Sequence, residues 1–150
     1  MIYTELTCKA MMTAYNAHQG QLDVNGVPYI FHPYHVAEQM KDEITVCVAL
    51  LHDVVEDTGV TMDELAAEFP DEVIGALKLL THEPGTDYYE YVKRICTNPV
   101  ARAVKMGDML HNMDESRIYD KSKVGEERLK HWREKYARAI KILEGSSVEI

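Results

Sequence analysis

The chain has 150 residues, of which 46% are hydrophobic and 27% are charged, and its formal net charge is −9. This composition is typical of one soluble globular domain, and the acidic balance argues against nucleic-acid binding, which needs a basic surface. No apolar run approaches the roughly 20 residues of a membrane span. We therefore expect neither nucleic acid nor membrane as a partner, whereas a small anionic ligand is compatible with the charge if a metal ion and a few cations hold it.

The cysteines and the first residues indicate a cytoplasmic protein. Cys8, Cys47 and Cys96 are far apart and odd in number, which favours reduced thiols over a disulfide set or a zinc site. The first residues, MIYTELTCKA, lack the basic and then apolar segments of a secretory signal. The oligomeric state is left open by the sequence.

Helical patterns dominate the chain from end to end, and sustained strand-like alternation is absent from the sequence. We therefore predict an all-α fold and one compact domain over residues 1–150. The turn-rich segment LDVNGVPYI and the break HEPGTD interrupt the helices. Helices are expected, in chain order, at residues 4–17, from 33 onward, at 44–57, from 62 onward, and at 71–81, 88–96, 100–112 and 126–143, the last ended by GSS.

Several of these helix ends carry specific local signals. Gly20, in HQGQ, is a natural stop for the first helix, and Pro33 suits the first position of the second helix. Thr61 and Glu64 stand at capping-box spacing. Asn98-Pro99 combines a cap with a first-turn proline.

The segment VALLHDVVEDTG changes abruptly from apolar to charged at His52. On one continuous helix, with about 100° between successive residues, His52, Asp53, Glu56 and Asp57 would share a face about 140° wide. Three carboxylates placed so closely repel one another unless a cation lies between them. The segment therefore predicts a metal site, and the alternative is a hydrated acidic helix end.

Two further segments favour the metal site. YIFHP places His32 at the start of a helix, and KMGDMLHN places Asp108 and Asn112 one turn apart on another. Together with His52 and Asp53 they supply two imidazoles and two carboxylates. This mixture suits a first-row divalent ion such as Mn²⁺, Fe²⁺ or Co²⁺ better than Ca²⁺ or Mg²⁺, which prefer oxygen ligands. Zn²⁺ is a further possibility.

Four segments together, HQGQ, PYIFHP, ALLHDVVEDT and VKMGDMLHN, resemble the hydrolase domain of RelA/SpoT-type proteins and their small stand-alone relatives. These belong to the HD-domain metal-dependent phosphohydrolases, and the resemblance runs from about Ala17 to Asn112. It implies an HD-domain helical fold, one divalent metal ion with Mn²⁺ favoured, and a nucleotide-type anionic ligand. The implied reaction is the hydrolysis of guanosine-3′,5′-bis(diphosphate), or ppGpp, to GDP and pyrophosphate, with no room in the chain for a synthetase domain.

The resemblance also assigns roles to individual residues. Glu56 and Asp57 match the acidic pair that positions and activates the attacking water, with Glu56 as the leading candidate. Asn112 matches a polar residue that lines the nucleotide site. The metal ligands implied by the resemblance are His32, His52, Asp53 and Asp108.

The loop QLDVNGV departs from the family pattern, because the family carries arginine or lysine there and this chain has none and adds Asp23. Arg128 and Lys105 are candidate phosphate contacts that could compensate; the alternatives are a surface arginine and a solvated lysine. His18 either lines the site or has a polar role at a helix end. Trp132 could stack on a base, but a place in the core is preferred.

These departures leave other functions open. The alternatives are an HD-family phosphohydrolase acting on another nucleotide or phosphate ester, and a nucleotide-sensing module without catalytic activity. His82 lies between the HD pair and the last aspartate, where enzymes with two metal ions place extra ligands. Those enzymes usually show several such histidines, so one metal ion is preferred.

Overall fold

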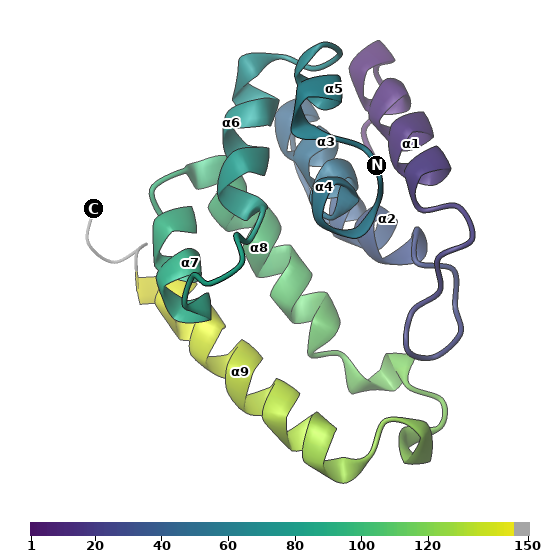
Figure 1. Ribbon diagram of the computed structural model, residues 1–150, viewed down its shortest axis with the longest axis vertical. Coiled ribbons are helices and arrows are strands. Elements are labelled where there is room, and N and C mark those ends of the chain that lie inside the picture. Colours follow the sequence, from purple (N-terminus) through teal and green to yellow (C-terminus); the bar gives the residue numbers. More distant parts are fainter. Residues whose placement is uncertain (146–150) are drawn as a thin grey trace.

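The computed structural model describes residues 1–145 (Figure 1), and within this range the predicted all-α fold is confirmed. Residues 1–145 contain no β-strand, and one isolated antiparallel bridge joins Leu22 to Pro28. The helices are α1 (Glu5–Ala17), α2 (Phe31–Glu38), α3 (Glu43–Leu51), α4 (Val54–Asp57), α5 (Met62–Ala66), α6 (Asp71–Leu80), α7 (Tyr88–Ile95), α8 (Pro99–Asn112) and α9 (Glu126–Gly145), with short 3₁₀ helices η1 (Glu115–Arg117) and η2 (Lys121–Lys123).

Local capping signals account for several helix ends. The Thr61 side chain accepts a hydrogen bond from the Glu64 N–H, and the Glu64 side chain accepts one from the Thr61 N–H. These two bonds complete the predicted capping box. Asn98 caps α8 with Pro99 in its first turn, and Gly20 follows α1 with a φ of 84°. Pro33 is the third residue of α2 rather than the first, because the helix already begins at Phe31.

The predicted helix over 44–57 is wrong as a continuous element. The chain forms α3 and α4 instead, and the helix is interrupted at His52 and Asp53. Asp53 has φ −104° and ψ 0°, in the sparsely populated bridge region where many active-site residues lie. The four charged residues therefore do not lie on one face of one regular helix.

The last helix and the segment before it also differ from the prediction. Helix α9 continues to Gly145, two residues beyond Leu143, and Ser146 and Ser147 of the predicted GSS stop lie outside the described residues. The segment before α9 contains η1 and η2. Each is preceded by an aspartate whose side chain accepts from a serine N–H two residues on, at Asp114 and Asp120, a local turn pattern that the helical period does not reveal.

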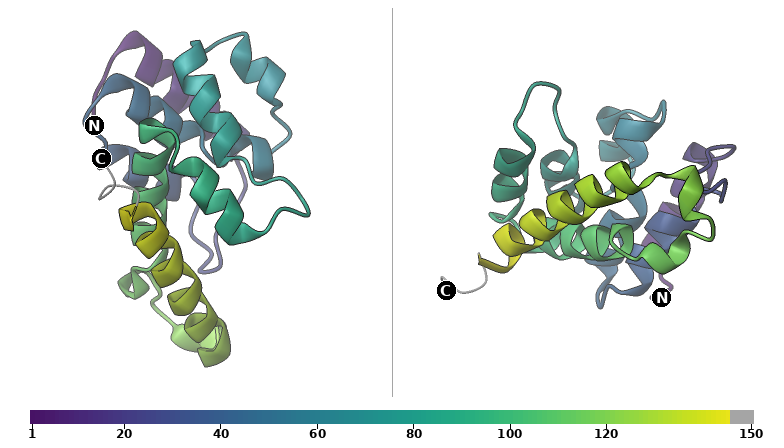
Figure 2. Two further views of the ribbon diagram at one scale, coloured as in Figure 1. Left: turned by 90° about the vertical axis from the view of Figure 1, so that its left-hand side faces the viewer. Right: turned by 90° about the horizontal axis from the view of Figure 1, so that it is seen from below.

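Helix α3 lies at the centre of the fold and is packed by α1, α2, α6 and α8 (Figures 1 and 2). Every residue from Thr45 to Leu51 is buried, as expected for a helix that is apolar all round. Helix α9 packs along α7 and α8 on one side of the molecule. None of the described helices combines the length and apolar character needed to cross a membrane.

Helices α2 and α8 approach each other closely at Gly107. A Cβ atom at this position would lie 3.1 Å from Val36 Cγ1 and 3.2 Å from Met40 Cε, closer than ordinary van der Waals contact. Glycine therefore permits the approach of α8 to α2. Because His32 lies on α2 and Asp108 on α8, this packing brings together two residues that are 76 positions apart in the chain.

Candidate metal centre and active site

The four predicted metal ligands, His32, His52, Asp53 and Asp108, converge from α2, the α3–α4 junction and α8; they are called the metal group below. Single donor atoms of His32, His52 and Asp53 all lie within 4.8 Å of one another. His32 Nε2 is 2.9 Å from Asp108 Oδ1 and 3.7 Å from Asp53 Oδ2. His52 Nε2 is 3.6 Å from Asp108 Oδ1 and 3.1 Å from Asp53 Oδ2. Both imidazoles thus direct Nε2 at the two carboxylates.

The hydrogen bonds of His52 fit a cation at this point. Its Nδ1 is 2.5 Å from the Ala49 carbonyl oxygen, and because a carbonyl can only accept, Nδ1 must carry the proton. In the neutral ring Nε2 is then unprotonated, yet it is buried without a hydrogen-bond partner. A buried lone pair beside two carboxylates is the donor arrangement of a divalent metal site, with a backbone carbonyl orienting the ligand.

Without a cation, protons and a lysine balance the buried carboxylates. Burial favours the neutral form of His52, but Asp53 and Asp108 outweigh it and hold the His52 pKa well above its usual value. Burial also opposes ionisation of Asp108, but Lys105 together with His32 and His52 outweighs it, so that the pKa of Asp108 lies well below its usual range. The pKa of Asp53 is lowered in the same way, against burial, by His52. A metal ion would take the place of the His52 proton.

Lys105 is buried beneath the metal group, so the alternative of a solvated helix position is wrong. Its Nζ is 2.9 Å from Asp108 Oδ2 and lies over the rings of Tyr91 and Tyr88. Burial disfavours its charge, but Asp108 holds the Lys105 pKa well above its usual value. Lys105 therefore binds one carboxylate oxygen of Asp108, while the other faces the histidines. Its predicted contact with a substrate phosphate stays a prediction.

Glu56 and Asp57 lie on α4 with exposed side chains. Glu56 Oε1 accepts a hydrogen bond from the His82 N–H, whereas the His82 ring nitrogen Nε2 is 2.8 Å from the Thr86 carbonyl oxygen. Although Asp57 is exposed, nearby protein atoms partly desolvate its carboxyl group, and this desolvation, followed by the charges of Asp53 and Glu56, raises the pKa of Asp57 to about 6. Asp57 therefore lies within the electrostatic field of the metal group, and Glu56 is bound to the loop after α6.

Two of the other predicted site residues lie close to the metal group. Asn112 Nδ2 donates to Asp108 Oδ1 over 3.0 Å. His18 is buried, its Nδ1 is 2.8 Å from Gln21 Oε1, and its Nε2 is buried without a hydrogen-bond partner. Burial lowers the pKa of His18, although the Asp53 charge opposes the shift. Each of these residues can thus present a polar atom to a ligand at the centre.

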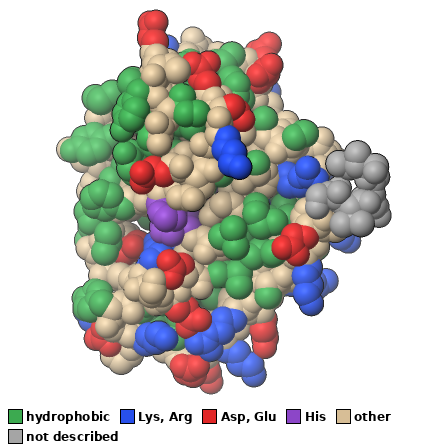
Figure 3. All heavy atoms as spheres, turned by 180° about the vertical axis from the view of Figure 1, so that it is seen from behind, with side chains coloured by type: hydrophobic (Ala, Val, Ile, Leu, Met, Phe, Trp, Pro, Cys, Tyr) green, Lys and Arg blue, Asp and Glu red, His purple; other side chains and the backbone are tan. Residues whose placement is uncertain are grey.

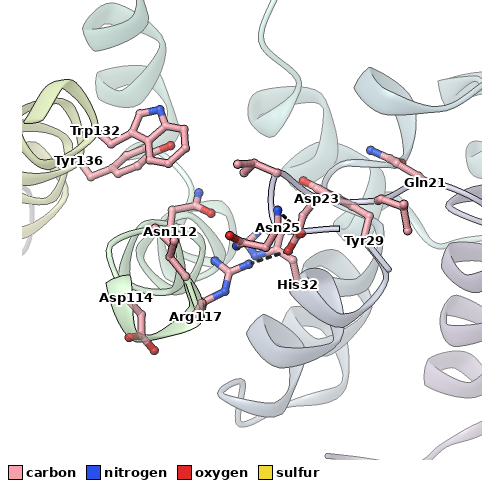
Figure 4. Close-up of a pocket in the computed structure, with 13 residues that line it drawn as sticks. Gln21, Asp23, Asn25, Tyr29, His32, Asn112, Asp114, Arg117, Trp132 and Tyr136 are labelled. Carbon is pink, nitrogen blue, oxygen red and sulfur yellow. Dashed lines mark hydrogen bonds and ion pairs between the residues drawn. The ribbon is translucent and has the colours of Figure 1, made fainter. Parts of the chain in front are cut away.

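A cavity of about 310 Å³ opens beside the metal group (Figure 4). Trp132 of α9 is half-buried and lines this cavity, so the preferred place in the core is wrong. Arg128 is exposed, with its guanidinium carbon 5.9 Å from the Trp132 ring, and it is not among the lining residues. Functional side chains around the cavity include Tyr29, His32, Asn112, Arg117, Trp132 and Tyr136.

Sequence reasoning missed three of these residues. The Tyr29 hydroxyl donates to Asp53 Oδ2 over 2.6 Å; its position in PYIFHP, three residues before His32, was an available signal. Arg117 Nη1 donates to the His111 carbonyl oxygen over 2.9 Å, and Nη2 is 3.7 Å from Asp23 Oδ2. Arg117 and Tyr136 follow no motif, and only the tertiary fold brings them to the cavity (Figure 4).

Comparison with known proteins gives consistent matches. The family model described as HD domain matches residues 10–82. "Probable GTP pyrophosphokinase" of Mycobacterium leprae is 35% identical over 123 residues, covering 73% of this chain and 16% of that protein. "Guanosine-3′,5′-bis(diphosphate) 3′-pyrophosphohydrolase MESH1" of Homo sapiens is 30% identical over 144 residues, covering 88% of this chain and 80% of that protein.

A solved structure described as a metazoan ortholog of SpoT that hydrolyses ppGpp has the same fold, with a TM-score of 0.80 and 21% identity over 97% of this chain and 89% of that chain. The chain thus spans 16% of the first two curated relatives that it matches, and 80% of MESH1.

The helical fold and the matching family model define an HD domain, and the His/His/Asp group is its candidate metal site. Within that class, the chain belongs to the HD-domain phosphohydrolase family that includes the SpoT- and MESH1-type ppGpp hydrolases.

Proposed function

We propose that the protein is a metal-dependent guanosine-3′,5′-bis(diphosphate) 3′-pyrophosphohydrolase, which converts ppGpp to GDP and pyrophosphate. The observation that carries the proposal is the convergence of the metal group beside a cavity of about 310 Å³, within the usual size range of small-molecule sites. The activity for which the MESH1 relatives are named supports the choice of substrate. A cytoplasmic location is part of the same proposal.

The metal group would hold one divalent ion, with Mn²⁺ favoured and Fe²⁺, Co²⁺ or Zn²⁺ as alternatives. Such an ion lowers the pKa of bound water and polarises a phosphoryl oxygen. The surrounding residues orient the ligands: Tyr29 donates to Asp53, and Lys105 neutralises one oxygen of Asp108. These contacts support a centre that is organised before the substrate arrives.

Glu56 and Asp57 would orient the attacking water and accept its proton. The water oxygen forms a bond to the phosphorus attached to the ribose 3′-oxygen, the bond to that oxygen breaks, and the 3′-oxygen takes up a proton as GDP leaves. The raised pKa of Asp57, about 6, suits a general base near neutral pH. Glu56 remains the leading candidate for this general base, and Asp57 shares the role.

The cavity walls supply recognition for the rest of the nucleotide. Trp132 and Tyr136 form an aromatic wall on α9 against which a base could stack (Figure 4). Arg117 offers a guanidinium in place of the basic residues missing from the QLDVNGV loop, and an arginine can bind phosphate through two hydrogen bonds. Asn112 and His18 are proposed as polar contacts at the metal end.

A substrate screen tests the proposed function. Purified Mn²⁺-loaded protein should release pyrophosphate from ppGpp, and removal of the ion by a chelator should abolish turnover until Mn²⁺ is restored. Parallel assays with nucleoside monophosphates and NADPH address the other phosphohydrolase function. Strong monophosphatase activity without ppGpp turnover would make a nucleoside monophosphate the substrate instead of ppGpp. Binding of ppGpp without any metal-dependent hydrolysis would support the nucleotide-sensing module.

Kinetics of single variants can show whether Arg117 or Arg128 binds the substrate phosphate. We expect Arg117→Leu to raise the KM for ppGpp by about 10- to 100-fold at nearly constant kcat, because a hydrogen bond to a charged group contributes about 1.5–3 kcal/mol of binding. Arg128→Leu is the matched variant, since its side chain is exposed and does not line the cavity. Steady-state kinetics on both variants measure KM and kcat for ppGpp. A KM increase only in the Arg128 variant would transfer the role to Arg128.

A further inference from the structure

The two histidines of the metal group differ in what holds their second ring nitrogen. His52 Nδ1 donates to the Ala49 carbonyl, a common partner for a metal-binding histidine. His32 Nδ1 is instead 2.7 Å from Nδ1 of His111, near the end of α8. The two ring planes differ by only 8° and their centroids are 5.0 Å apart. Because the nitrogens are much closer than the centroids, the rings meet edge to edge as in an in-plane hydrogen bond.

The metal site fixes the direction of this hydrogen bond. When His32 binds an ion through Nε2, that nitrogen must present its lone pair, so the proton of the neutral ring lies on Nδ1. His32 Nδ1 is then the donor, and His111 Nδ1 must be an unprotonated acceptor. His111 can serve in this way only as a neutral imidazole.

His111 also contacts two other neighbours, His35 and Arg117. His35 packs face to face on His111, with ring centroids 4.0 Å apart and planes 18° apart, and Arg117 donates to the His111 carbonyl oxygen.

The same contacts restrain the ring. His35 is exposed and lies one turn after His32 on α2, so it covers the outer side of the half-buried His111. Histidine side chains reach the surface on the face drawn in Figure 3. The His111 ring is thus held against α2 by an edge contact with His32 and a face contact with His35.

From this geometry we propose that His111 is a positioning residue of the metal centre: it accepts the Nδ1 proton of His32 and thereby directs Nε2 of His32 at the ion. The inference rests on the metal site of the proposed function. Partners of this kind typically change metal affinity by about 10- to 100-fold when they are removed. The resemblance to the family assigned no role to His111.

Asparagine and glutamine variants test the inference because their amide oxygens imitate different ring nitrogens. The Asn side-chain oxygen lies near the position of Nδ1 and can accept from His32, whereas the Gln oxygen lies near Nε2 and cannot. We expect H111A and H111Q to bind Co²⁺ about 10- to 100-fold more weakly than the unmodified protein, and H111N to recover most of the affinity. Chelator competition, followed by the visible absorption of bound Co²⁺, measures the affinities.

NMR of the Zn²⁺-loaded protein provides a second readout. The Nδ1 proton of His32 should be protected from exchange in the unmodified protein and in H111N, and should exchange rapidly in H111A. His131, exposed on α9, gives the matched control variant H131A, which should change neither readout. Unchanged Co²⁺ affinity in H111A, or equal losses in H111A and H111N, would overturn the inference. If the unmodified protein bound neither Co²⁺ nor Zn²⁺, that result would instead refute the metal site and the proposed function.

Discussion

Replacing His52 by alanine should remove the metal ion and destabilise the fold at once. His52 Nε2 lies 3.1 Å from Asp53 and 3.6 Å from Asp108, so the variant loses one ligand and leaves two buried carboxylates without their shared partner. Removing one member of a buried charged group costs about 3–5 kcal/mol of unfolding free energy. Hydrolysis should fall on the order of 10³-fold or more, because the metal contributes several kcal/mol to transition-state stabilisation.

Metal analysis and urea unfolding of protein purified without chelators measure the two effects. Asp53→Asn is a companion variant of nearly the same shape, which should lose the metal with a smaller change in packing. His131→Ala, an exposed position on α9, provides a comparison for the loss of an imidazole as such. A His52→Ala protein that keeps its metal content and its activity would contradict the assignment of His52 as a ligand.

Replacing Glu56 by glutamine should separate metal binding from water activation. The side chain keeps its size and loses its charge, and it stands outside the metal group, so metal content should be preserved. Loss of a general base typically costs about 10²- to 10⁴-fold in rate, and kcat should fall accordingly. Asp57→Asn, studied alongside, shows how the two carboxylates divide the role.

The pH profile assigns the base more sharply. A base works in its deprotonated form, so kcat/KM should rise with pH through the pKa of the responsible carboxylate. The pKa of Asp57 is about 6, and the positive charge of a bound ion would lower it, which places the rising limb at or below about pH 6. If Asp57 is the base, the limb should disappear in Asp57→Asn and persist in Glu56→Gln. Full activity in both variants would refute the water-activating role of the pair.

The parts of the fold that were predictable from the sequence depend on residues close together in the chain. The Thr61–Glu64 box and the Asn98 cap are local hydrogen bonds across two or three residues, and the structure contains both. The interruption of the helix at Asp53 has no such signal, because neither glycine nor proline occurs between Ile44 and Asp57. Its cause is tertiary, since Asp53 must turn toward partners on α2 and the preceding loop.

The same distinction holds in the site. Spacing suggested a metal at His52 and Asp53. His32 and Asp108 are distant in sequence; the segments YIFHP and KMGDMLHN offered them, and the resemblance to known enzymes implied that they are ligands. Lys105 is three residues before Asp108, a spacing at which helical side chains meet, so their pairing could have been foreseen. The positions of Arg117 and Trp132 could not, because they depend on how η1 and α9 return across the end of α8.

The distance between His32 on α2 and Asp108 on α8 depends on how closely the two helices pack at Gly107. A methyl group there would meet Val36 and Met40 and require shifts of a few tenths of an ångström. Metal–oxygen distances differ by similar amounts, about 2.0–2.2 Å for zinc and about 2.3–2.6 Å for calcium. We therefore expect the ionic radius accepted by the centre to be set by the hydrophobic contact between α2 and α8, through a residue that has no side chain to offer an ion.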